Sequence, residues 1–540
     1  MSEGIEEFIS PVLFFVVPLL IVILIKFGYK LKNKKFSYKI PENSSKYGYF
    51  ILVIVLILCI LATSPIAGQG YDTPFFVFNA NHIRENGLLE IFQTDRPLTY
   101  FLTDIIGWIF NVPGRVSIPI SSVVFTTFYV VSIFVLALTL TKNTLLATMS
   151  SLLAVGSNMI RLSALCFVGN ILGFAFLYLF FSVVIKFYET GRKLHLCLSV
   201  VIFICIFFSH FITSLIAIII LIFLFSYLLI INNQRNLVHL GICILSCFIL
   251  LILCTVSYAE NLIVLSSLVN INIGGGMFLQ YLAYDWSSDY LWIFLFTIVG
   301  AWVTLFECKL SEKFLTAWTV GLIILLFFSS VEASRIILYL PFSILSSIGI
   351  YFVINQYFKR NTRKIFIYTL IFLMLVPSVY YIRMQHMNIK YYEEGPFFWD
   401  TKFLETEQLK WIKNNYNTNS IVVLTDLSWN PDPISLNEKG LIAGVHYRIL
   451  AKIGNNVYFG NLSDLLLEKP DIRGNTRTIL GTYSSLNIDW TLKNKTILIP
   501  TTIYKISDNE KEICYNITDG IYVIKSLTEE EKQVWLKKNG

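Results

Sequence analysis

Residues 70–104 read GYDTPFFVFNANHIRENGLLEIFQTDRPLTYFLTD, and they decide how the rest of the chain is interpreted. They form the first polar segment after a long apolar one. The segment combines a carboxylate, histidine and arginine side chains and an Asp-Arg-Pro-Leu turn. A simple connector between two membrane-spanning helices needs none of these groups. We therefore expect this segment to be the active-site loop.

The composition of the chain is that of a membrane protein. Of its 540 residues, 55% are hydrophobic and only 14% are charged, whereas soluble domains carry about 25% charged residues. The net charge of +7 comes mostly from lysine-rich loops, so it indicates one side of a membrane and not a nucleic-acid partner. Of the nine cysteines only Cys514 lies clear of the apolar part, which excludes a disulfide framework and a Cys-x-x-Cys metal site.

The apolar segments predict a polytopic α-helical membrane protein with about 12 transmembrane helices, because one span needs about 20 apolar residues. The expected spans are residues 11–27, 49–66, 116–140, 145–159, 162–185, 196–208, 211–231, 238–258, 291–306, 314–328, 336–352 and 365–381. The run 196–231 must be split, since one helix of that length would extend about 54 Å across a hydrocarbon core of about 30 Å. Splitting it at Ser209 and His210 places His210 at the outer surface.

The basic residues predict the orientation of the chain. The lysine-rich loop after the first span should be cytoplasmic, because cytoplasmic loops carry an excess of lysine and arginine. Alternation of the spans then puts nearly all other short basic loops on the same side. Five arginines remain outside, namely Arg84, Arg96, Arg115, Arg161 and Arg335. The active site and the C-terminal domain are therefore expected to be extracytoplasmic.

Three parts are expected along the chain. Residues 1–48 form an extra N-terminal transmembrane helix and a cytoplasmic lysine-rich loop, residues 49–384 a transmembrane catalytic domain with its first outer loop at 67–115, and residues 385–540 an extracytoplasmic soluble domain. The soluble domain should be α/β or α+β, with helices at 403–415 and after Thr528. Its strands are expected at 420–425, 478–483, 496–500 and 520–524.

The first outer loop should begin with a helix at residues 73–86, capped by Asp72. Capping is the simpler role for Asp72. The functional alternative rests on its position directly outside a spanning helix, at the start of a polar stripe of Asn79, His82 and Asn86. His82 lies about 15 Å along the helix from Asp72, which is too far for both to bind one metal ion.

A second amphipathic helix is expected between the turns at 94–97 and 111–114. Apolar residues recur along it every three or four positions, which predicts a helix lying in the membrane interface. These residues are Leu98, Phe101, Leu102, Ile105 and Ile109. Arg96 at its start would either grip a phosphate or reach toward the lipid headgroups, and the sequence leaves both roles open. For Asp104, on the polar side of this helix, we expect a structural role.

Other polar side chains are expected at the same outer surface. His210, in the segment Ser-His-Phe-Ile-Thr, would contact a phosphate, bind a metal with a nearby carboxylate, or serve only as a helix cap. Glu332 and Arg335 lie together at the outer end of a span. They would either pair with each other or form a lipid-phosphate site.

The order of these features resembles the GT-C integral membrane glycosyltransferases. The resemblance rests on Gly-Tyr-Asp at 70–72, on Glu-Asn-Gly at 85–87 and on the Asp-Arg-Pro-Leu turn at 95–98. The order of helices extends it over about residues 49–382. The branch most similar to this chain includes the protein mannosyltransferases and the aminoarabinose and RgtA-like transferases. Thr73 departs from the Asp-Glu pair of many members.

The resemblance implies inverting transfer of a sugar from a polyprenyl-phosphate-linked donor in the membrane to a protein, lipid or glycan acceptor. Asp72 is then the catalytic base, and positive groups stabilise the departing phosphate. The candidates for phosphate binding are Arg96, Arg161, His210 and Arg335, and the secondary candidates are His82, Asn79, Asp95 and Glu332. No soluble nucleotide or nucleic acid is expected, and a divalent metal is left open.

The alternative is a non-catalytic membrane protein, such as a lipid-linked sugar transporter or a glycan-assembly subunit. A transporter should show internal repeats and charged or helix-breaking residues near the middle of the membrane. In this sequence the spans are almost free of ionisable groups, and the polar candidates gather at one surface. This pattern favours a surface enzyme.

Overall fold

The computed structural model describes a part of the chain. The described residues are 46–67, 76, 80, 83–84, 91, 96–112, 114–157, 160, 168–230, 237–257, 296–305, 310–328, 339–357, 411, 414–415, 421–424, 456–459, 497–500, 511–518, 521–524 and 529–539. The chain divides into two compact units. Unit 1 comprises Met1–Pro65, Val123–Ala164 and Val168–Met384, and unit 2 comprises Ile66–Ser122, Leu165–Phe167 and Gln385–Gly540.

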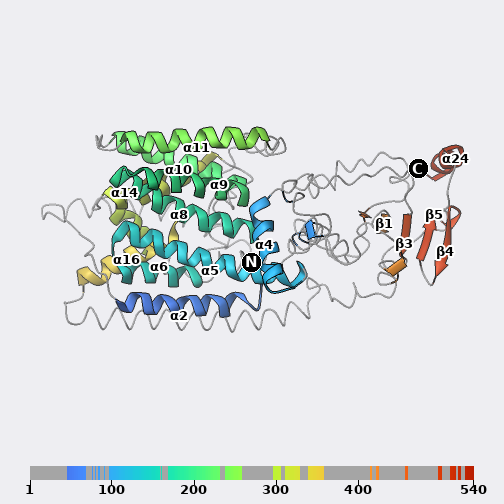
Figure 1. Cartoon of the computed structure of the whole chain (residues 1–540), viewed down its shortest axis with the longest axis horizontal. Coiled ribbons are helices and arrows are strands. Elements are labelled where there is room, and N and C mark those ends of the chain that lie inside the picture. The colour runs from blue at the N-terminus through green and yellow to red at the C-terminus, as the bar shows by residue number, and fades with distance from the viewer. Residues whose placement is uncertain are drawn as a thin grey trace, which may run out of the picture. The chain divides into compact units, whose positions relative to one another are not determined.

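Unit 1 is a bundle of apolar helices (Figure 1). Its helices are α2 (Lys46–Thr63), the larger part of α5 (Gly114–Thr141), α6 (Thr144–Val155), α8 (Val168–Thr190), α9 (Lys193–Ser209), α10 (Phe211–Ile230), α11 (Leu237–Ser257), a short helix Phe296–Leu305, α14 (Leu310–Phe328) and α16 (Phe342–Tyr357). Within the described part of the chain, four helices are long and apolar enough to cross a membrane, and these are α5, α8, α10 and α11. The remaining apolar helices are shorter.

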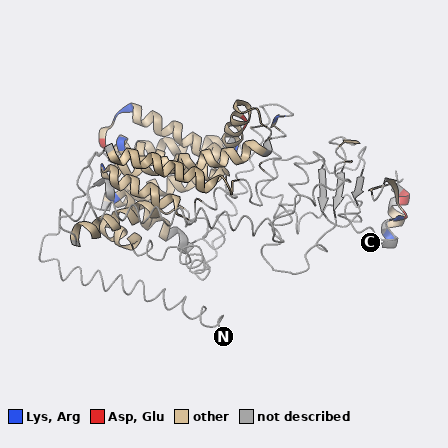
Figure 2. Ribbon diagram, turned by 90° about the horizontal axis from the view of Figure 1, so that it is seen from below, with Lys and Arg blue, Asp and Glu red and all other residues tan. Residues whose placement is uncertain are grey.

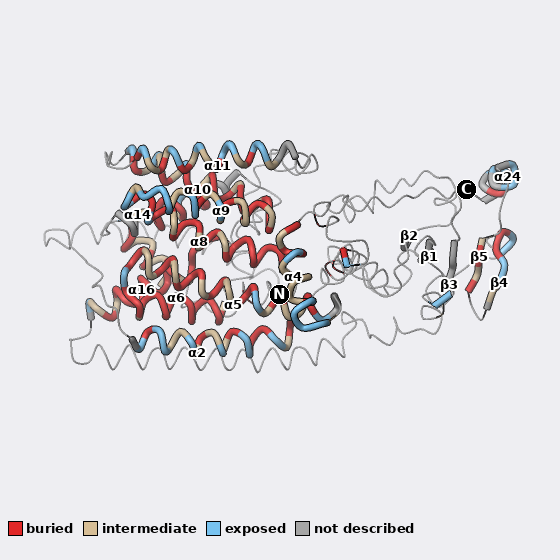
Figure 3. Tube along the Cα trace, viewed as in Figure 1, coloured by how far each residue is buried: buried red, intermediate tan, exposed pale blue. Residues whose placement is uncertain are grey.

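Helix α8 forms the centre of the bundle, and α11 lies at its edge. In the most apolar stretch of each helix, 83% of the residues of α8 are buried, against 22% of those of α11. Figure 3 shows the same contrast, with α8 buried along most of its length and exposed residues along α2 and α11. The exposed residues of α11 include Leu245, Phe248 and Leu253. Such a large exposed apolar face is expected of a helix that contacts lipid.

Small and hydroxyl-bearing residues join the inner helices. The hydroxyl oxygens of Ser150 in α6 and Ser347 in α16 lie 2.6 Å apart and are joined by a hydrogen bond. Gly300 and Gly349 bring their two helices so close that a Cβ at either position would collide with the backbone of the other helix. Close backbone approach and hydroxyl hydrogen bonds are typical of helix contacts inside membranes, where apolar burial contributes little to helix association.

The predicted split of the long apolar run is confirmed. Helix α9 ends at Ser209, His210 has extended backbone angles, and α10 begins at Phe211. The predicted spans over residues 116–140 and 238–258 likewise correspond to α5 and α11. The predicted spans at 11–27 and 365–381 lie outside the described residues.

Several helices differ from the prediction at their ends, and α6 and α16 are two of them. The span expected at 145–159 is the helix α6, which ends at Val155 with Gly156 as its C-cap. The span expected at 336–352 is the helix α16, which begins only at Phe342. Pro341 explains the later start, because proline lacks the amide hydrogen and disfavours helical angles in the preceding residue. Tyr339 therefore lies in a turn before the helix.

Positive charge gathers at one end of the bundle, as Figure 2 shows. The described lysine and arginine residues of unit 1 lie at helix ends or in short turns, and they include Lys142, Lys186, Arg192, Lys193 and Lys313. This is the distribution that the alternating topology predicted. Which side of the membrane this end faces remains a prediction based on the excess of basic residues in cytoplasmic loops.

The described part of the C-terminal region contains a mixed five-stranded sheet. Its strands are β1 (Ile421–Leu424), β2 (Asn456–Phe459), β3 (Ile497–Pro500), β4 (Cys514–Thr518) and β5 (Ile521–Ile524), in the order β2-β1-β3-β5-β4. Strand β1 pairs in parallel with β2 and β3, and β5 pairs antiparallel with β3 and β4. Helix α24 (Glu529–Asn539) follows. The predicted strands at 420–425, 496–500 and 520–524 are confirmed, whereas β2 and β4 were not predicted and the expected strand at 478–483 lies outside the described residues.

Candidate functional site

The first outer loop contains the expected helical segment. Phe76, Ala80, Ile83 and Arg84 are helical. The first three are 2%, 5% and 2% exposed. Their spacing of four and three residues places them on one face of the helix. The segment is therefore held in place through this buried face.

Helix α4 (Pro97–Ile109) begins against this segment. Arg96 occupies its N-cap position, and Pro97 starts the first turn. The guanidinium carbon of Arg96 lies 5.4 Å from the centre of the Phe76 ring, which is a cation–π distance. The Phe76 ring also packs against Tyr100, with ring centres 5.9 Å apart. These two contacts fix the position of the Arg96 side chain at the start of α4.

The two faces of α4 are reversed relative to a helix of a soluble protein. Its buried residues are small, hydroxyl-bearing or aromatic, namely Pro97, Thr99, Tyr100, Thr103 and Gly107. Its exposed residues include Phe101 at 41%, Trp108 at 80% and Ile109 at 61% exposure. An outward face of this kind is expected of a helix that lies in the membrane interface. The geometry thus agrees with the interfacial helix predicted from the sequence.

Arg84 connects the first helical segment to α4 and to the turn that follows α4. Its Nε lies 3.4 Å from Oδ1 of Asp104. Its Nη1 donates a hydrogen bond of 2.6 Å to the carbonyl oxygen of Val112. Gly107 leaves room for the guanidinium, because a Cβ at this position would collide with Nη2 of Arg84. Asp104 is therefore paired with Arg84, and the structural role expected for it stays a prediction.

A second polar cluster lies in unit 1, where α9 meets α10. His210 is 7% exposed, and its Nδ1 lies 2.8 Å from the hydroxyl oxygen of Thr213. That hydroxyl lies 2.9 Å from the hydroxyl of Tyr339, which itself is 3.4 Å from Nδ1 of His210. The three side chains thus form a closed triangle of polar contacts inside the bundle.

Tyr339 is held at both its backbone and its ring. The indole Nε1 of Trp318 in α14 donates to the carbonyl oxygen of Tyr339 at 2.9 Å. The Tyr339 ring stands edge-on to Phe174 of α8, with centres 4.6 Å apart. One turn of α8 comes close to His210 because residue 173 is glycine, where a Cβ would lie 2.9 Å from Cβ of His210. The cluster therefore joins α8, α9, α10 and α14.

Most of the predicted site residues cannot be placed. Of these residues the structure describes Arg96 in unit 2 and His210 in unit 1. The others lie outside the described residues, and they are Asp72, Asn79, His82, Asp95, Arg161, Glu332 and Arg335. Their roles remain proposals.

The sequence analysis missed Thr213 and Tyr339, which contact His210, and the contacts of Arg84 with Asp104 and Val112. Thr213 follows His210 by three positions, so local spacing was a usable signal for it. Tyr339 and Arg84 make contacts across 129 and 28 positions of the chain, respectively. A single sequence gives no signal for pairings of that separation.

No metal site is formed by the described part of the chain, where no three His, Cys, Asp or Glu side chains come together.

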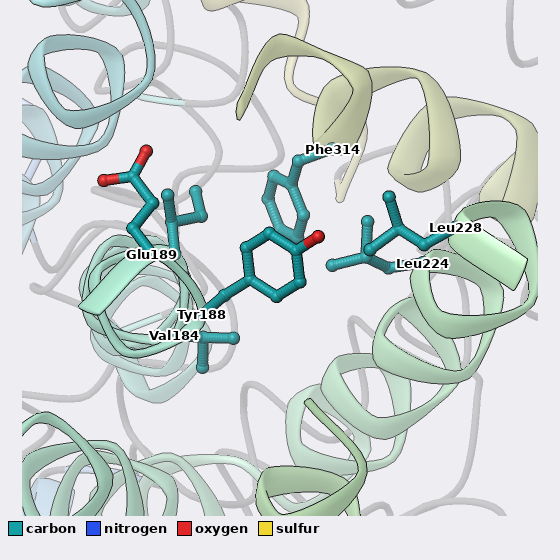
Figure 4. Close-up of a pocket in the computed structure, with 7 residues that line it drawn as sticks. Val184, Tyr188, Glu189, Leu224, Leu228 and Phe314 are labelled. Carbon is teal, nitrogen blue, oxygen red and sulfur yellow. The ribbon is translucent and has the colours of Figure 1, made fainter. Parts of the chain in front are cut away.

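Unit 1 has a small cavity of about 40 Å³ between α8, α10 and α14, lined by Val184, Ile185, Tyr188, Glu189, Leu224, Leu228 and Phe314. In Figure 4, Tyr188 extends between Phe314 and Leu224, while Glu189 points away from Leu224 and Leu228. The cavity lies at the C-terminal end of α8 and is too small for a sugar or a lipid headgroup, so we do not assign it to the site.

Solved membrane transferases share the fold of this chain. The Archaeoglobus fulgidus oligosaccharyltransferase in complex with Zn and sulfate matches with a TM-score of 0.54 and 12% identity, over 83% of this chain and 68% of that one. A second match is the oligosaccharyltransferase AglB from the same organism, in complex with an inhibitory peptide and a dolichol-phosphate. Its TM-score is 0.52 at 13% identity, and the match covers 84% of this chain and 69% of AglB. ArnT from Cupriavidus metallidurans bound to undecaprenyl phosphate matches with a TM-score of 0.52 and 8% identity, over 90% and 99%.

At the level of sequence, no protein-family description and no curated protein matches the chain significantly. The fold and the apolar helices together define a multi-pass membrane protein. More particularly, its fold is that of the GT-C membrane glycosyltransferases, to which AglB and ArnT belong. The resemblance stated from the sequence is thereby confirmed for the fold.

Proposed function

We propose that this chain is a glycosyltransferase that takes a sugar from a polyprenyl-phosphate-linked donor and transfers it to a protein, lipid or glycan acceptor at the outer face of the membrane. The observation that carries the proposal is the match to ArnT bound to undecaprenyl phosphate, which covers 90% of this chain and 99% of that one. AglB, with the same fold, has been solved with a dolichol-phosphate. Two transferases of this fold thus bind a polyprenyl-type phosphate.

The proposed reaction is a single inverting displacement. The acceptor oxygen forms a bond to the anomeric carbon of the sugar while the bond from that carbon to the phosphate oxygen breaks. The electron pair of the broken bond stays on the lipid phosphate, and the acceptor proton passes to the carboxylate of Asp72. A positioned base of this kind contributes about 10²- to 10⁴-fold to a rate.

Positive and hydrogen-bonding groups would stabilise the phosphate that leaves with the lipid. We assign this role to Arg96, Arg161, His210 and Arg335. The geometry of Arg96 supports its assignment, because its guanidinium is held over Phe76 at the start of an interfacial helix. Planar guanidinium groups suit phosphate oxygens, and a side chain fixed in advance loses little entropy on binding.

A metal has been observed in one solved transferase of this fold. An oligosaccharyltransferase of this fold has been solved with Zn, but the described residues of this chain do not form a set of metal ligands. Asp72 and the other proposed carboxylates lie outside the described residues.

The function is tested in cells that lack the gene. Membrane lipids, glycoproteins and glycans from the deletion strain, the parent and a complemented strain are compared by mass spectrometry. We expect one glycan or lipid to lose the mass of a sugar unit in the deletion strain and to regain it on complementation. An unchanged sugar content in all three fractions would contradict the proposal, and accumulation of an unflipped lipid-linked sugar would indicate a transporter instead.

A further inference from the structure

The hydrogen-bonded triangle around His210 holds one nitrogen of the imidazole in a fixed environment. The backbone amide of His210 donates to the carbonyl of Ile206 at 2.8 Å, and the amide of Thr213 donates to the carbonyl of His210 at 3.0 Å. The side chain of Thr213 therefore sits one turn after His210 by the geometry of the helix start. Its hydroxyl reaches Nδ1 at 2.8 Å. The local backbone thus selects Nδ1 as the nitrogen that contacts Thr213.

The distances in this triangle leave the donor of each pair open, and the acidity of the Tyr339 hydroxyl favours one direction. A phenol is a stronger donor than an aliphatic hydroxyl, and a neutral imidazole nitrogen is a strong acceptor. The favoured order is donation from the Tyr339 hydroxyl to Thr213 Oγ1, 2.9 Å away, and from the Thr213 hydroxyl to Nδ1 of His210. Since a neutral imidazole carries one hydrogen, an acceptor at Nδ1 places that hydrogen on Nε2.

Tyr339, the first donor in this series of hydrogen bonds, is held firmly in place. Tyr339 is 2% exposed, and Trp318 holds its backbone carbonyl at 2.9 Å. Phe174 packs against its ring at 4.6 Å between centres. In sequence, Tyr339 follows Arg335 by four positions.

We propose that Thr213 and Tyr339 are positioning residues, which hold the His210 imidazole with its hydrogen on Nε2 so that Nε2 donates to the phosphate of the lipid carrier. The inference rests on the proposed function and deepens it, since it assigns the donating atom and its supports. Buried groups that orient a ligating histidine in this way fix both its ring position and its tautomer. Neither Thr213 nor Tyr339 is required to touch the lipid.

Binding of undecaprenyl phosphate to the full chain in lipid nanodiscs tests the proposal. The side-chain amide of glutamine can replace Nε2 of histidine as a donor, whereas that of asparagine corresponds to Nδ1. We therefore expect His210→Gln to keep most of the affinity and His210→Asn to weaken binding about tenfold. We expect Thr213→Val to weaken it about five- to tenfold and Tyr339→Phe about threefold, since one hydrogen bond contributes about 1 kcal/mol. Thr213→Ser keeps the hydroxyl and should bind like the wild type.

Two control variants remove a buried hydroxyl without touching the triangle. Ser214→Ala is next to Thr213, and its hydroxyl donates to the carbonyl of Phe211 at 2.6 Å. Tyr178→Phe changes another tyrosine that packs on Trp318, with ring centres 5.3 Å apart. Both should bind undecaprenyl phosphate within about twofold of the wild type. Thermal unfolding of every variant separates loss of fold from loss of binding.

A double-mutant cycle distinguishes positioning from a general structural role. In a His210→Asn background, Thr213→Val should weaken binding by less than about twofold, because its effect acts through the imidazole. An equal loss in both backgrounds, or no loss from Thr213→Val in the wild-type background, would overturn the inference while leaving the transferase proposal intact. Failure of the wild type to bind either undecaprenyl phosphate or dolichyl phosphate would overturn both. If Thr213→Val does not fold, the comparison of His210→Gln with His210→Asn tests the inference. Equal binding by these two variants would contradict donation from Nε2.

Discussion

The Nε atom of Arg84 lies 3.4 Å from Oδ1 of Asp104, and the two side chains are 35% and 23% exposed. The same guanidinium donates to the carbonyl of Val112 at 2.6 Å. Arg84 thus ties the first helical segment of the outer loop to α4 and to the turn that leads into α5. An ion pair with this exposure contributes about 0.2–1 kcal/mol, and the hydrogen bond to Val112 adds about 1 kcal/mol.

Arg84→Ala should therefore destabilise the protein more than Asp104→Asn does. The arginine variant loses both contacts, and the aspartate variant loses only the ion pair. We expect the free energy of unfolding to fall by about 1–2 kcal/mol in Arg84→Ala and by less than about 1 kcal/mol in Asp104→Asn. Both losses are measured as lowered unfolding temperatures in the same detergent. The double variant should be no less stable than Arg84→Ala alone. Equal losses from the two single changes would show that the Val112 contact contributes nothing.

Gly107→Ala tests the space that the Arg84 side chain occupies. A Cβ at Gly107 would collide with Nη2 of Arg84, so the guanidinium must leave its position. The matched control is Gly241→Ala in α11, where a Cβ meets only Phe225 at 3.8 Å. Alanine in place of glycine inside a helix is favourable by about 1 kcal/mol when nothing collides. We expect Gly107→Ala to lower the unfolding temperature and Gly241→Ala to leave it unchanged or raise it. A higher unfolding temperature in both variants would exclude the tight packing of Arg84 against Gly107.

The outward face of α4 predicts contact with lipid. A nitroxide attached at Trp108→Cys, where the native side chain is 80% exposed, should collide more often with dissolved oxygen than with a water-soluble nickel complex, because oxygen concentrates in the apolar phase. A label at Glu530→Cys on the exposed side of α24 serves as the aqueous control. Equal collision profiles at the two positions, measured by power-saturation spectroscopy in liposomes, would place α4 in water.

The helical part of the fold was largely predictable, because membrane spans are set by length and apolarity. The split at His210 followed from a run too long for one helix, and the structure has α9 and α10 on either side of it. The start of α16 was placed too early because the apolar pattern continues through Pro341, which lacks an amide hydrogen and disfavours a helical conformation of the residue before it. Strand β2 was missed because the segment Asn456–Phe459 is four residues long and takes its stability from pairing with β1.

The candidate site was predictable only in part. Arg96 and His210 were singled out because charged and polar residues stand out against an apolar chain, and their roles stay predictions. Their partners were not found, since Phe76 and Tyr339 are ordinary aromatic residues in the sequence and become distinctive only through the contacts that the fold creates. The pairing of Arg84 with Asp104 likewise depends on how two helices meet, which local patterns do not specify.

The orientation of the chain is tested with single cysteines in a variant whose native cysteines are replaced. Lys537→Cys lies on an exposed position of α24, and Arg192→Cys lies in the exposed turn between α8 and α9. The excess of basic residues predicts that the turn between α8 and α9 is cytoplasmic. A membrane-impermeant maleimide should therefore label position 537 in intact cells and position 192 only after permeabilisation. The reverse pattern would invert the topology and place the proposed site on the cytoplasmic side.

Sugar transfer by the Asp72→Asn variant tests whether Asp72 is the catalytic base. Asparagine still caps a helix but cannot accept the acceptor proton. We predict a rate lowered by about 10²- to 10⁴-fold, with expression and unfolding temperature unchanged. Asp104→Asn, which changes another carboxylate of the same loop, should keep its activity. Full activity in the Asp72→Asn variant, measured with the acceptor found in the deletion strain, would show that Asp72 is not the base.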